Sequence, residues 1–521
     1  MTEIIDRALA LAIQAGATGN ANTPFVLNAI KELSNNRSVP ANKALVEANV
    51  IRGAKVAVEL SRIQRGIKSS NYMPSILIGD NVLAGLNNDL HRKSVEQAQP
   101  SKSLPSDSKE GISMETSITP PAEIVVAGSL AVDLSCDYTP SPGRPYVPQQ
   151  HTSNPCQISD SLGGVGNNIA RAAHLLGTNV RLCTAVADDL AGRGALQALQ
   201  ATGLDTSGVQ VLSGKTGART ARYIAINDAK KDLVMAVSDM SIIEHITPAT
   251  ITQQSSSHLA PPGSSKPSWL IVDGNWSQDA LHAWLSAART HSIPTAFEPV
   301  STAKSLRLLS PNSTSSPTTY PTPTIDLCTP NALELTAMHT AARSSGLFDR
   351  QDWWIVVDAF GIPSSGATAH LTYLTSPALV TAGIPQRALQ LLPFIPTLAT
   401  KLGADGVLLT MLLAADDPRL SDPDAAPYIL SRSGTGERGV GGVYMRLFPA
   451  AETVPEGEVV SVSGCGDTFL GALVAGMVVE ERKGGKARME DVVMFAQRAA
   501  CATLRSREAV APELRGMAFR R

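Results

Sequence analysis

A glycine-rich turn near the C-terminus, in VVSVSGCGDTFLGALVAGM, carries the strongest chemical signal of this chain. We expect it to lead from a strand into a helix that starts near Asp467. The backbone amides of Gly464, Cys465 and Gly466 would then converge on an anion at the helix N-terminus. A carboxylate beside an anion site is unfavourable in a merely structural loop, so Asp467 is a candidate general base. The alternative is an ordinary helix-capping residue next to a flexible turn.

Two further segments are candidates for binding a hydroxylated substrate. In DSLGGVGNNIARAAHLLG, Gly163 and Gly164 allow the backbone to approach a ligand, and Asn168 near the helix start can cap that helix or bind sugar hydroxyls. In VAGSLAVDLSCD, we place Asp133 at the C-terminal end of the first strand, the edge at which open α/β sheets bind ligands. Its carboxylate would accept hydrogen bonds from vicinal hydroxyls.

The segment CTPNALEL is a candidate Mg²⁺ or phosphate site. Asn331 and Glu334 are three positions apart at a predicted helix start, so they share a face that could hold a hydrated cation. Taken alone, the same pattern describes a capped helix.

Strand and helix patterns alternate after Pro121, which predicts a mostly parallel sheet covered by helices on both faces. The expected buried strands include SWLIVDGN, PTAFEPV, IDLCTPN, IPTLATKL and GVLLTML. The segment TARYIAINDAKKDLVMAVSDM differs, because two alternating runs flank a polar turn. We interpret it as a hairpin standing off the main sheet, suited to serve as a lid.

Three Ser- and Pro-rich tracts divide the sequence. Residues 97–121 have the composition of a disordered linker between residues 1–66 and a domain at 122–521. Tracts near 253–267 and 310–324 are predicted to be low-complexity surface insertions within that domain.

Composition narrows the function classes. The 521 residues carry a net charge of −2 and only 4% aromatic residues, which argues against binding nucleic acid or an anionic membrane. Glu3 and Asp6 stand where a signal peptide would be positively charged, and the six cysteines are scattered without metal-ligand spacing. We therefore expect an intracellular protein, cytoplasmic or organellar and not secreted.

These motifs in this order, together with KLGADGVLL at 401–409, resemble the ribokinase-like (PfkB) family of sugar and nucleoside kinases. The resemblance spans about 123–507 and implies a three-layer α/β sandwich with a small β-lid. It implies ATP and Mg²⁺ as cofactors and leaves a monovalent cation open. The residue roles it implies are a base at Asp467; an anion hole at Gly464, Cys465 and Gly466; substrate binding by Asp133, Gly163, Gly164 and Asn168; and nucleotide or Mg²⁺ organisation by Asn331, Glu334, Lys401, Gly403 and Gly406, with Glu334 as the metal ligand. Ser461-Val462 depart from the family's usual Asp-Thr before this turn.

Two other stretches resemble proteins of pseudouridine metabolism. The lid hairpin and FEPVS at 297–301 look like those of pseudouridine kinases. Residues 1–66 resemble the C-terminal part of pseudouridine-5′-phosphate glycosidases, with Asn42 at the position of an active-site asparagine. The catalytic lysines and aspartate of that family would lie upstream of the given sequence, so a short helical fragment is expected.

The leading hypothesis is an ATP-dependent kinase that phosphorylates the 5′-hydroxyl of pseudouridine or a related nucleoside or sugar. One alternative is a bifunctional enzyme with pseudouridine-5′-phosphate glycosidase activity, if the catalytic part exists upstream. Another is a non-enzymatic truncated fusion. The expected partner is a small molecule, and homo-oligomerisation is left open.

Overall fold

The computed structural model describes residues 2–15, 22–34, 121–143, 145–213, 217–263, 265–309, 316–363, 366–485 and 488–519. The chain divides into two compact units, Met1–Ile112 and Ser113–Arg521. In the first unit, helices α1 (Thr2–Gln14) and α2 (Asn22–Leu33) pack together and bury Ala8, Ala12 and Ala29. Asn42 and all but the last residue of the 97–121 tract lie outside the described residues.

The second unit is built on a ten-stranded sheet with the order β13-β14-β12-β11-β10-β9-β8-β1-β4-β5. Neighbours from β11 to β5 pair in parallel, whereas β12, β14 and β13 continue the sheet antiparallel. The strands are β1 (Ile124–Ala127), β4 (Val180–Ala187), β5 (Val209–Leu212), β8 (Trp269–Asp273), β9 (Thr295–Glu298), β10 (Leu327–Cys328), β11 (Thr397–Lys401), β12 (Val407–Ala414), β13 (Ile429–Arg432) and β14 (Val440–Phe448). The mostly parallel sheet predicted from the alternation is confirmed.

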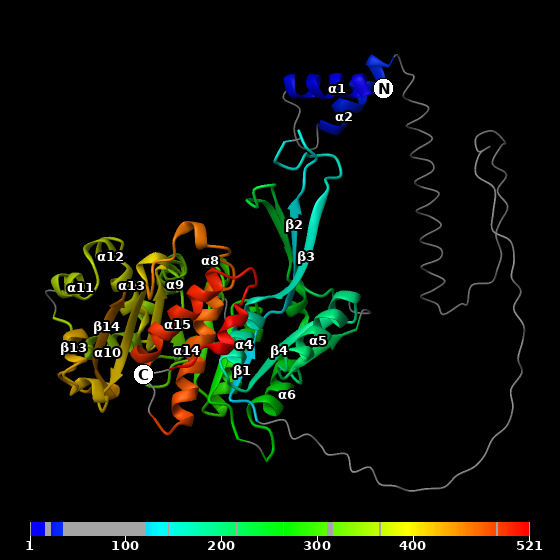
Figure 1. Ribbon diagram of the computed structural model, residues 1–521. Helices are drawn as coiled ribbons and strands as arrows, with labels where there is room; N and C mark the ends of the chain where they lie inside the picture. The colour runs from blue at the N-terminus through cyan, green and yellow to red at the C-terminus, as the bar shows by residue number, and fades with distance from the viewer. Residues whose placement is uncertain are drawn as a thin grey trace, which may run out of the picture. The chain divides into compact units, whose positions relative to one another are not determined.

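Helices cover both faces of this sheet (Figure 1). One face is covered by α4 (Val165–Leu175), α5 (Leu190–Ala201), α14 (Cys465–Arg482) and α15 (Met489–Leu504). The other is covered by α6 (Pro248–Leu259), α7 (Gln278–Thr290), α9 (Ala332–Ser344), α10 (Gln351–Ala359), α11 (Thr368–Leu374) and α13 (Ile384–Leu391), with the short α8 (Thr302–Ser305) and α12 (Pro377–Thr381) between them. Among the described helices, none has the length and apolar character of a transmembrane span.

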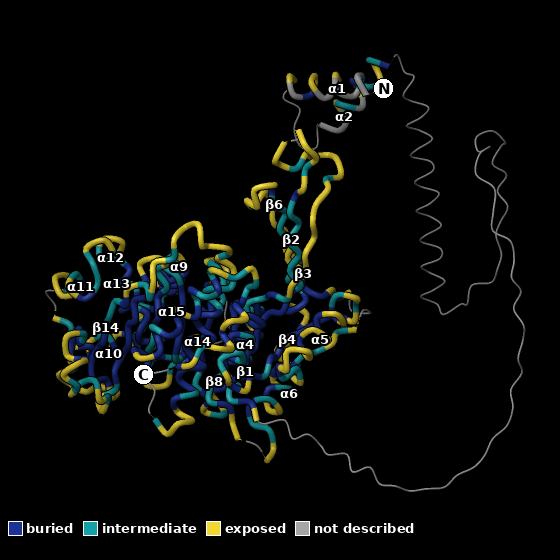
Figure 2. Tube along the Cα trace, in the orientation of Figure 1, coloured by how far each residue is buried: buried dark blue, intermediate teal, exposed yellow. Residues whose placement is uncertain are grey.

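The sequence dictates this layering through strand alternation. In β1, Ile124 and Val126 join the core under α4 and α14, whereas Val125 and Ala127 join the core on the opposite face. Successive side chains of a strand point to opposite faces, so an unbroken apolar run fits a strand covered on both sides. Figure 2 shows the resulting buried interior of the sheet and its helices.

A second sheet, with the order β3-β2-β6-β7, stands off the first. It contains β2 (Ala131–Tyr138), β3 (Cys156–Gly163), β6 (Arg222–Asn227) and β7 (Leu233–Asp239). The predicted hairpin is confirmed as the antiparallel pair β6–β7, and β2 and β3 extend it into a four-stranded sheet that we call the lid.

The two internal Ser- and Pro-rich tracts are more ordered than a surface insertion. Residues 253–259 lie in α6, which begins where it does because Thr247 caps it and Pro248 occupies its first turn. Ser255 and Leu259 of this helix are buried. Residues 316–324 are also described, and Thr319 and Thr324 are buried there. Hydroxyl-rich composition therefore did not exclude packing, since a buried hydroxyl can be satisfied within the protein, as Thr324 Oγ1 is by the amide of Thr318 at 2.9 Å.

Candidate active site

The glycine-rich turn places the N-terminus of α14 at the centre of the candidate site. The helix begins at Cys465, two residues before the expected start, and no side chain caps it. Gly464 has φ 77°, and a Cβ there would lie 1.9 Å from the carbonyl oxygen of Ala509, so glycine is required on both counts. The first amides of α14 are thus left to bind an anion.

The prediction of a strand before this turn is wrong. Residues 459–464 form no strand, and the β-branched Val460 and Val462 are exposed rather than buried in a sheet. The amides of Val460 and Ser461 donate to the carbonyl of Leu504 at the end of α15. This segment therefore lies against the end of a helix and has no strand partner.

Asp467 is held by a residue from a distant part of the chain. The Nδ2 of Asn168, in α4, donates to Asp467 Oδ2 at 2.9 Å. Burial of the carboxyl, with the nearby charge of Glu298, raises the pKa of Asp467 to about 7, although Asn168 and Lys401 oppose the shift. A carboxyl group with this pKa can exchange a proton near neutral pH.

A buried ion pair lies beside the same helix end. Lys401 Nζ donates to both carboxylate oxygens of Glu298 at 2.9 Å, and Thr329 Oγ1 donates to Glu298 Oε2 at 2.6 Å. Burial alone would lower the pKa of Lys401, but Glu298 and the neighbouring carboxylates raise it, so the ammonium stays charged. A Cβ on Gly466 would lie 3.0 Å from Lys401 Nζ, which places this positive charge next to the first turn of α14.

Glu298 was missed in the sequence. The signal was present, because FEPVS puts an acidic residue at the C-terminal end of a predicted buried strand. Glu298 is 3% exposed at the end of β9. A carboxylate buried to this degree requires a partner, and that partner, Lys401, ends the strand two places along the sheet.

Asn331 and Glu334 form a reciprocal cap at the start of α9. Asn331 Oδ1 accepts from the amides of Leu333 and Glu334 at 2.9 Å, and Glu334 Oε2 accepts from the amide of Asn331 at 2.8 Å. The capped helix that this sequence pattern also describes is therefore confirmed. One Glu334 oxygen has no hydrogen bond in this cap, so a role toward a cation is compatible with it.

The donors near α14 and α9 suit a weakly held, hydrated divalent cation better than a closed metal cage. Among the described residues, no group of three or more His, Cys, Asp or Glu side chains could hold a metal. Mg²⁺ commonly keeps several waters and binds one or two carboxylates together with substrate phosphates. Glu334, which has one carboxylate oxygen outside the cap, fits that pattern.

In the turn after Lys401, close packing requires one of the two glycines. Gly406 has φ 91°, and a Cβ there would lie 2.0 Å from the carbonyl oxygen of Phe448, at the end of β14. Gly403 has φ 63° with open space around it. Both glycines shape the β11–β12 connection.

We expected Asp133 to lie at the C-terminal end of the first strand of the main sheet, and this prediction is wrong. That strand, β1, stops at Ala127, and the chain crosses at Gly128 into the lid, where Asp133 lies near the base of β2. Burial raises the pKa of Asp133 to about 6. A Cβ on Gly163 would lie 1.8 Å from Asp133 Oδ2, so this glycine lets the carboxylate sit against the backbone at the lid base.

A second missed residue, Asp273, fixes the start of α4. It is fully buried at the end of β8. Its Oδ2 accepts from the amide and hydroxyl of Ser129 at 2.8 and 2.9 Å and from the amide of Gly166 at 3.1 Å. Because α4 carries Asn168, Asp273 indirectly positions the hydrogen bond to Asp467.

Comparison with known protein families gives two matches along the chain. Residues 121–345 match the pfkB family of carbohydrate kinases, and residues 1–59 match indigoidine synthase A like proteins. The chain therefore carries a pfkB-family carbohydrate kinase domain, preceded by an indigoidine synthase A like segment. The sequence-based resemblance to this kinase family is confirmed.

The chain is similar over nearly its whole length to a pseudouridine-metabolizing bifunctional protein of Schizosaccharomyces pombe, with 27% identity covering 99% of this chain and 62% of that protein. The pseudouridine kinase of Escherichia coli is 29% identical over 30% of this chain and 46% of its own. The pseudouridine-5′-phosphate glycosidase of Arabidopsis thaliana is 46% identical over 11% of this chain and 17% of its own. The chain thus spans less than two thirds of each of these relatives.

Among solved structures, the ribokinase of Giardia lamblia aligns with a TM-score of 0.49 and 15% identity, covering 76% of this chain and 97% of that one.

Proposed function

We propose that this chain transfers the γ-phosphoryl group of ATP to the 5′-hydroxyl of pseudouridine or a related nucleoside. The observation that carries the proposal is Asp467, a carboxyl with its pKa near neutrality at the uncapped start of α14. The names of the S. pombe and E. coli relatives support pseudouridine as the first substrate to test. Because ATP is the donor, the proposed site of action is intracellular.

In this mechanism Asp467 accepts the proton of the attacking hydroxyl, and Asn168 keeps one carboxylate oxygen in place. Charge on the transferred group is stabilised by the amides of Gly464, Cys465 and Gly466 and by the ammonium of Lys401. When bound, Mg²⁺ supplies charge neutralisation of the phosphate oxygens. Glu334 would hold it on the α9 side of the site, and the amide of Asn331 would keep that carboxylate in place.

The proposal is tested by supplying the purified chain with ATP, Mg²⁺ and, in turn, pseudouridine, uridine, adenosine, ribose and fructose. We expect the highest kcat/KM with pseudouridine and a 5′-phosphorylated product, identified by mass spectrometry. ATP consumption that is independent of every acceptor would contradict the proposal.

The pH dependence of turnover follows from the raised pKa of Asp467. Below a pH of about 7 the carboxyl is protonated and cannot accept the hydroxyl proton, so kcat should fall as the pH decreases through about 7. The measurement is kcat from pH 5.5 to 9 at saturating substrates. A constant kcat across this range would exclude Asp467 as the base.

Asp133, Gly163, Gly164 and Asn168 are proposed to bind the sugar. Because Asp133 would hold hydroxyls in the ground and transition states alike, Asp133→Ala should raise the KM for the nucleoside about tenfold or more and change kcat little. Initial rates at varied nucleoside and at varied ATP separate the two substrates. A rise confined to the KM for ATP would place the nucleoside elsewhere.

Homo-oligomerisation is proposed from the two unlike faces of the lid. Residues paired across its strands share a face, and one such row is Ile158, Cys136, Ile226 and Met235. Ile158 and Met235 are 61% and 53% exposed. Asp133 lies on the opposite face by strand alternation, so the apolar face points away from the proposed sugar site and is open to a second copy of this chain.

A dimer through this face should dissociate when charge is introduced there. Light scattering coupled to gel filtration should give twice the monomer mass for the natural chain and the monomer mass for Met235→Lys. Ser238→Lys, exposed on the opposite face of β7, is the matched control and should remain dimeric. Equal masses for all three chains would contradict the proposed interface.

The N-terminal match does not lead us to propose a glycosidase activity. The A. thaliana enzyme shares only 17% of its length with this chain, and Asn42 lies outside the described residues.

A further inference from the structure

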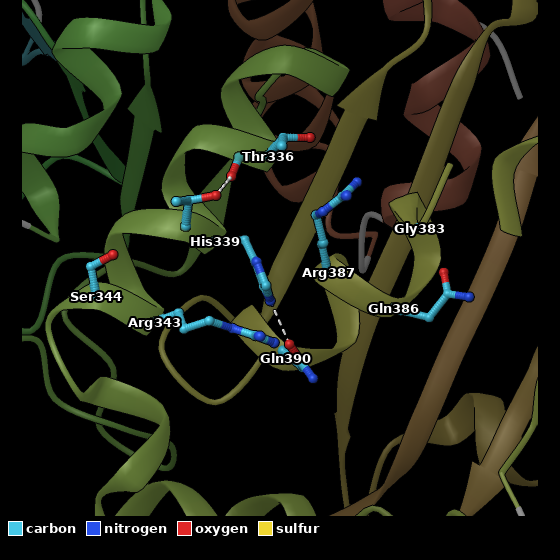
Figure 3. Close-up of a pocket in the computed structure, with 9 residues that line it drawn as sticks. Thr336, His339, Arg343, Ser344, Gly383, Gln386, Arg387 and Gln390 are labelled. Atoms are coloured by element: carbon cyan, nitrogen blue, oxygen red, sulfur yellow. Dashed lines mark hydrogen bonds between the residues drawn. The ribbon is translucent and has the colours of Figure 1, made fainter. Parts of the chain in front are cut away.

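A polar pocket lies between α9 and α13, and the proposed kinase mechanism does not use it. Its volume is about 510 Å³, and residues of both helices line it (Figure 3). Glu334 is at the start of α9, and Arg343 follows it by about two and a half helical turns, roughly 13 Å along the axis. The arginine end of the pocket is therefore distant from Glu334, and no residue assigned to phosphoryl transfer lines the pocket.

The pocket is positively charged. Arg343 and Arg387 line it, no carboxylate does, and neither arginine forms an ion pair with any described residue. His339 lies between these two side chains in the view of Figure 3. Burial lowers the pKa of His339, and the two guanidinium groups add to this effect while Gln390 opposes it. The charge of the lining thus comes from the arginines.

Several hydrogen-bonding groups of the lining remain available. Arg387 Nη1 donates to the carbonyl of Ala382 at 2.6 Å. Among the described residues, neither the rest of this guanidinium group nor that of Arg343 has a hydrogen-bond partner. Gln386 Nε2 donates to the carbonyl of Val380 at 3.1 Å, but its Oε1 is buried without a partner. The two guanidinium groups are therefore available to a ligand with negative oxygens, whereas Gln386 Oε1 is enclosed by the protein.

The N-terminal end of α13 also favours a negatively charged ligand. Gly383 directly precedes this helix with φ 73° in the left-handed region, and no side chain caps the helix. Both Gly383 and Gln386 line the pocket, so the positive end of the helix dipole faces it. The carbonyl end of α9 acts in the opposite sense, and Arg343 in its last turn offsets that effect.

We propose that this pocket binds a tetrahedral oxyanion, namely inorganic phosphate or the phosphate group of a small ester. Guanidinium groups suit such anions because their parallel N–H donors match two oxygens at once. Free phosphate and a sugar phosphate share this chemistry, and binding measurements distinguish them.

The test is isothermal titration calorimetry of the full chain with inorganic phosphate and, separately, with ribose 5-phosphate. Both titrations are run at constant ionic strength with a non-hydrolysable ATP analogue in excess, which keeps added phosphate from the start of α14. We expect saturable binding of at least one ligand. Tighter binding of ribose 5-phosphate would identify an ester as the occupant, and equal or weaker binding would identify free phosphate.

Two variants and a control test whether the measured binding occurs in this pocket. Arg343→Gln and Arg387→Gln should each weaken binding about tenfold, the usual loss for one charge-assisted hydrogen bond. Arg438→Gln, exposed in the β13–β14 turn, should bind as the natural chain does. Thermal unfolding in chloride buffer verifies that each variant is folded. Affinities unchanged in both pocket variants, or no saturable binding by either ligand, would overturn the proposal.

Discussion

Replacing Asp467 with asparagine should lower kcat by about two to four orders of magnitude, the usual contribution of a general base. The amide cannot accept the hydroxyl proton, whereas the first amides of α14 and Lys401 remain in place to bind phosphates. ATP affinity, measured by calorimetry, should therefore change little. The chain should also stay folded, because asparagine has nearly the same volume as aspartate.

Asn168→Ala is the matched comparison for this variant. It removes the hydrogen bond at 2.9 Å but keeps the carboxylate, so its loss of kcat should be smaller than that of Asp467→Asn. This hydrogen bond also lowers the pKa of Asp467, so the acid limb of the pH profile should move to higher pH in Asn168→Ala. If Asp467→Asn retained kcat within a few-fold of the natural chain, the base would have to be sought elsewhere.

Replacing Lys401 with methionine should have the second largest effect, on both stability and rate. The substitution leaves Glu298 buried without its cation, which costs about 3 to 5 kcal/mol in the free energy of unfolding. It also removes the positive charge beside α14, and the loss of one such electrostatic group lowers kcat by about two to three orders of magnitude. Urea denaturation and steady-state kinetics measure the two effects.

A second substitution separates these effects. In the double variant Lys401→Met with Glu298→Gln, no charge is left unpaired, and the glutamine Oε1 can still accept from Thr329. We expect most of the stability to return while kcat stays low. Recovery of both quantities would show that Lys401 serves only to neutralise Glu298 and does not stabilise the transferred phosphoryl group.

The sequence by itself determined the chemistry-bearing helix starts and most of the strands. Such features depend on neighbours within a few residues: apolar runs for β8 and β12, glycines before α4 and α14, and the Asn331–Glu334 cap. Local signals also misled in places. The β-branched VVSV segment at 459–462 has strand propensity but no strand partner, so propensity alone could not make it a strand.

Only the tertiary structure decided which of these residues meet. Asn168 and Asp467 are 299 positions apart, and Lys401 and Glu298 are 103 apart. Their contacts depend on the order of the strands in the sheet, which brings the ends of β9 and β11 near the starts of α4 and α14. The same order assigned Asp133 to the lid. Local spacing contains no record of strand order, because that order is set by burying both faces of the sheet at once.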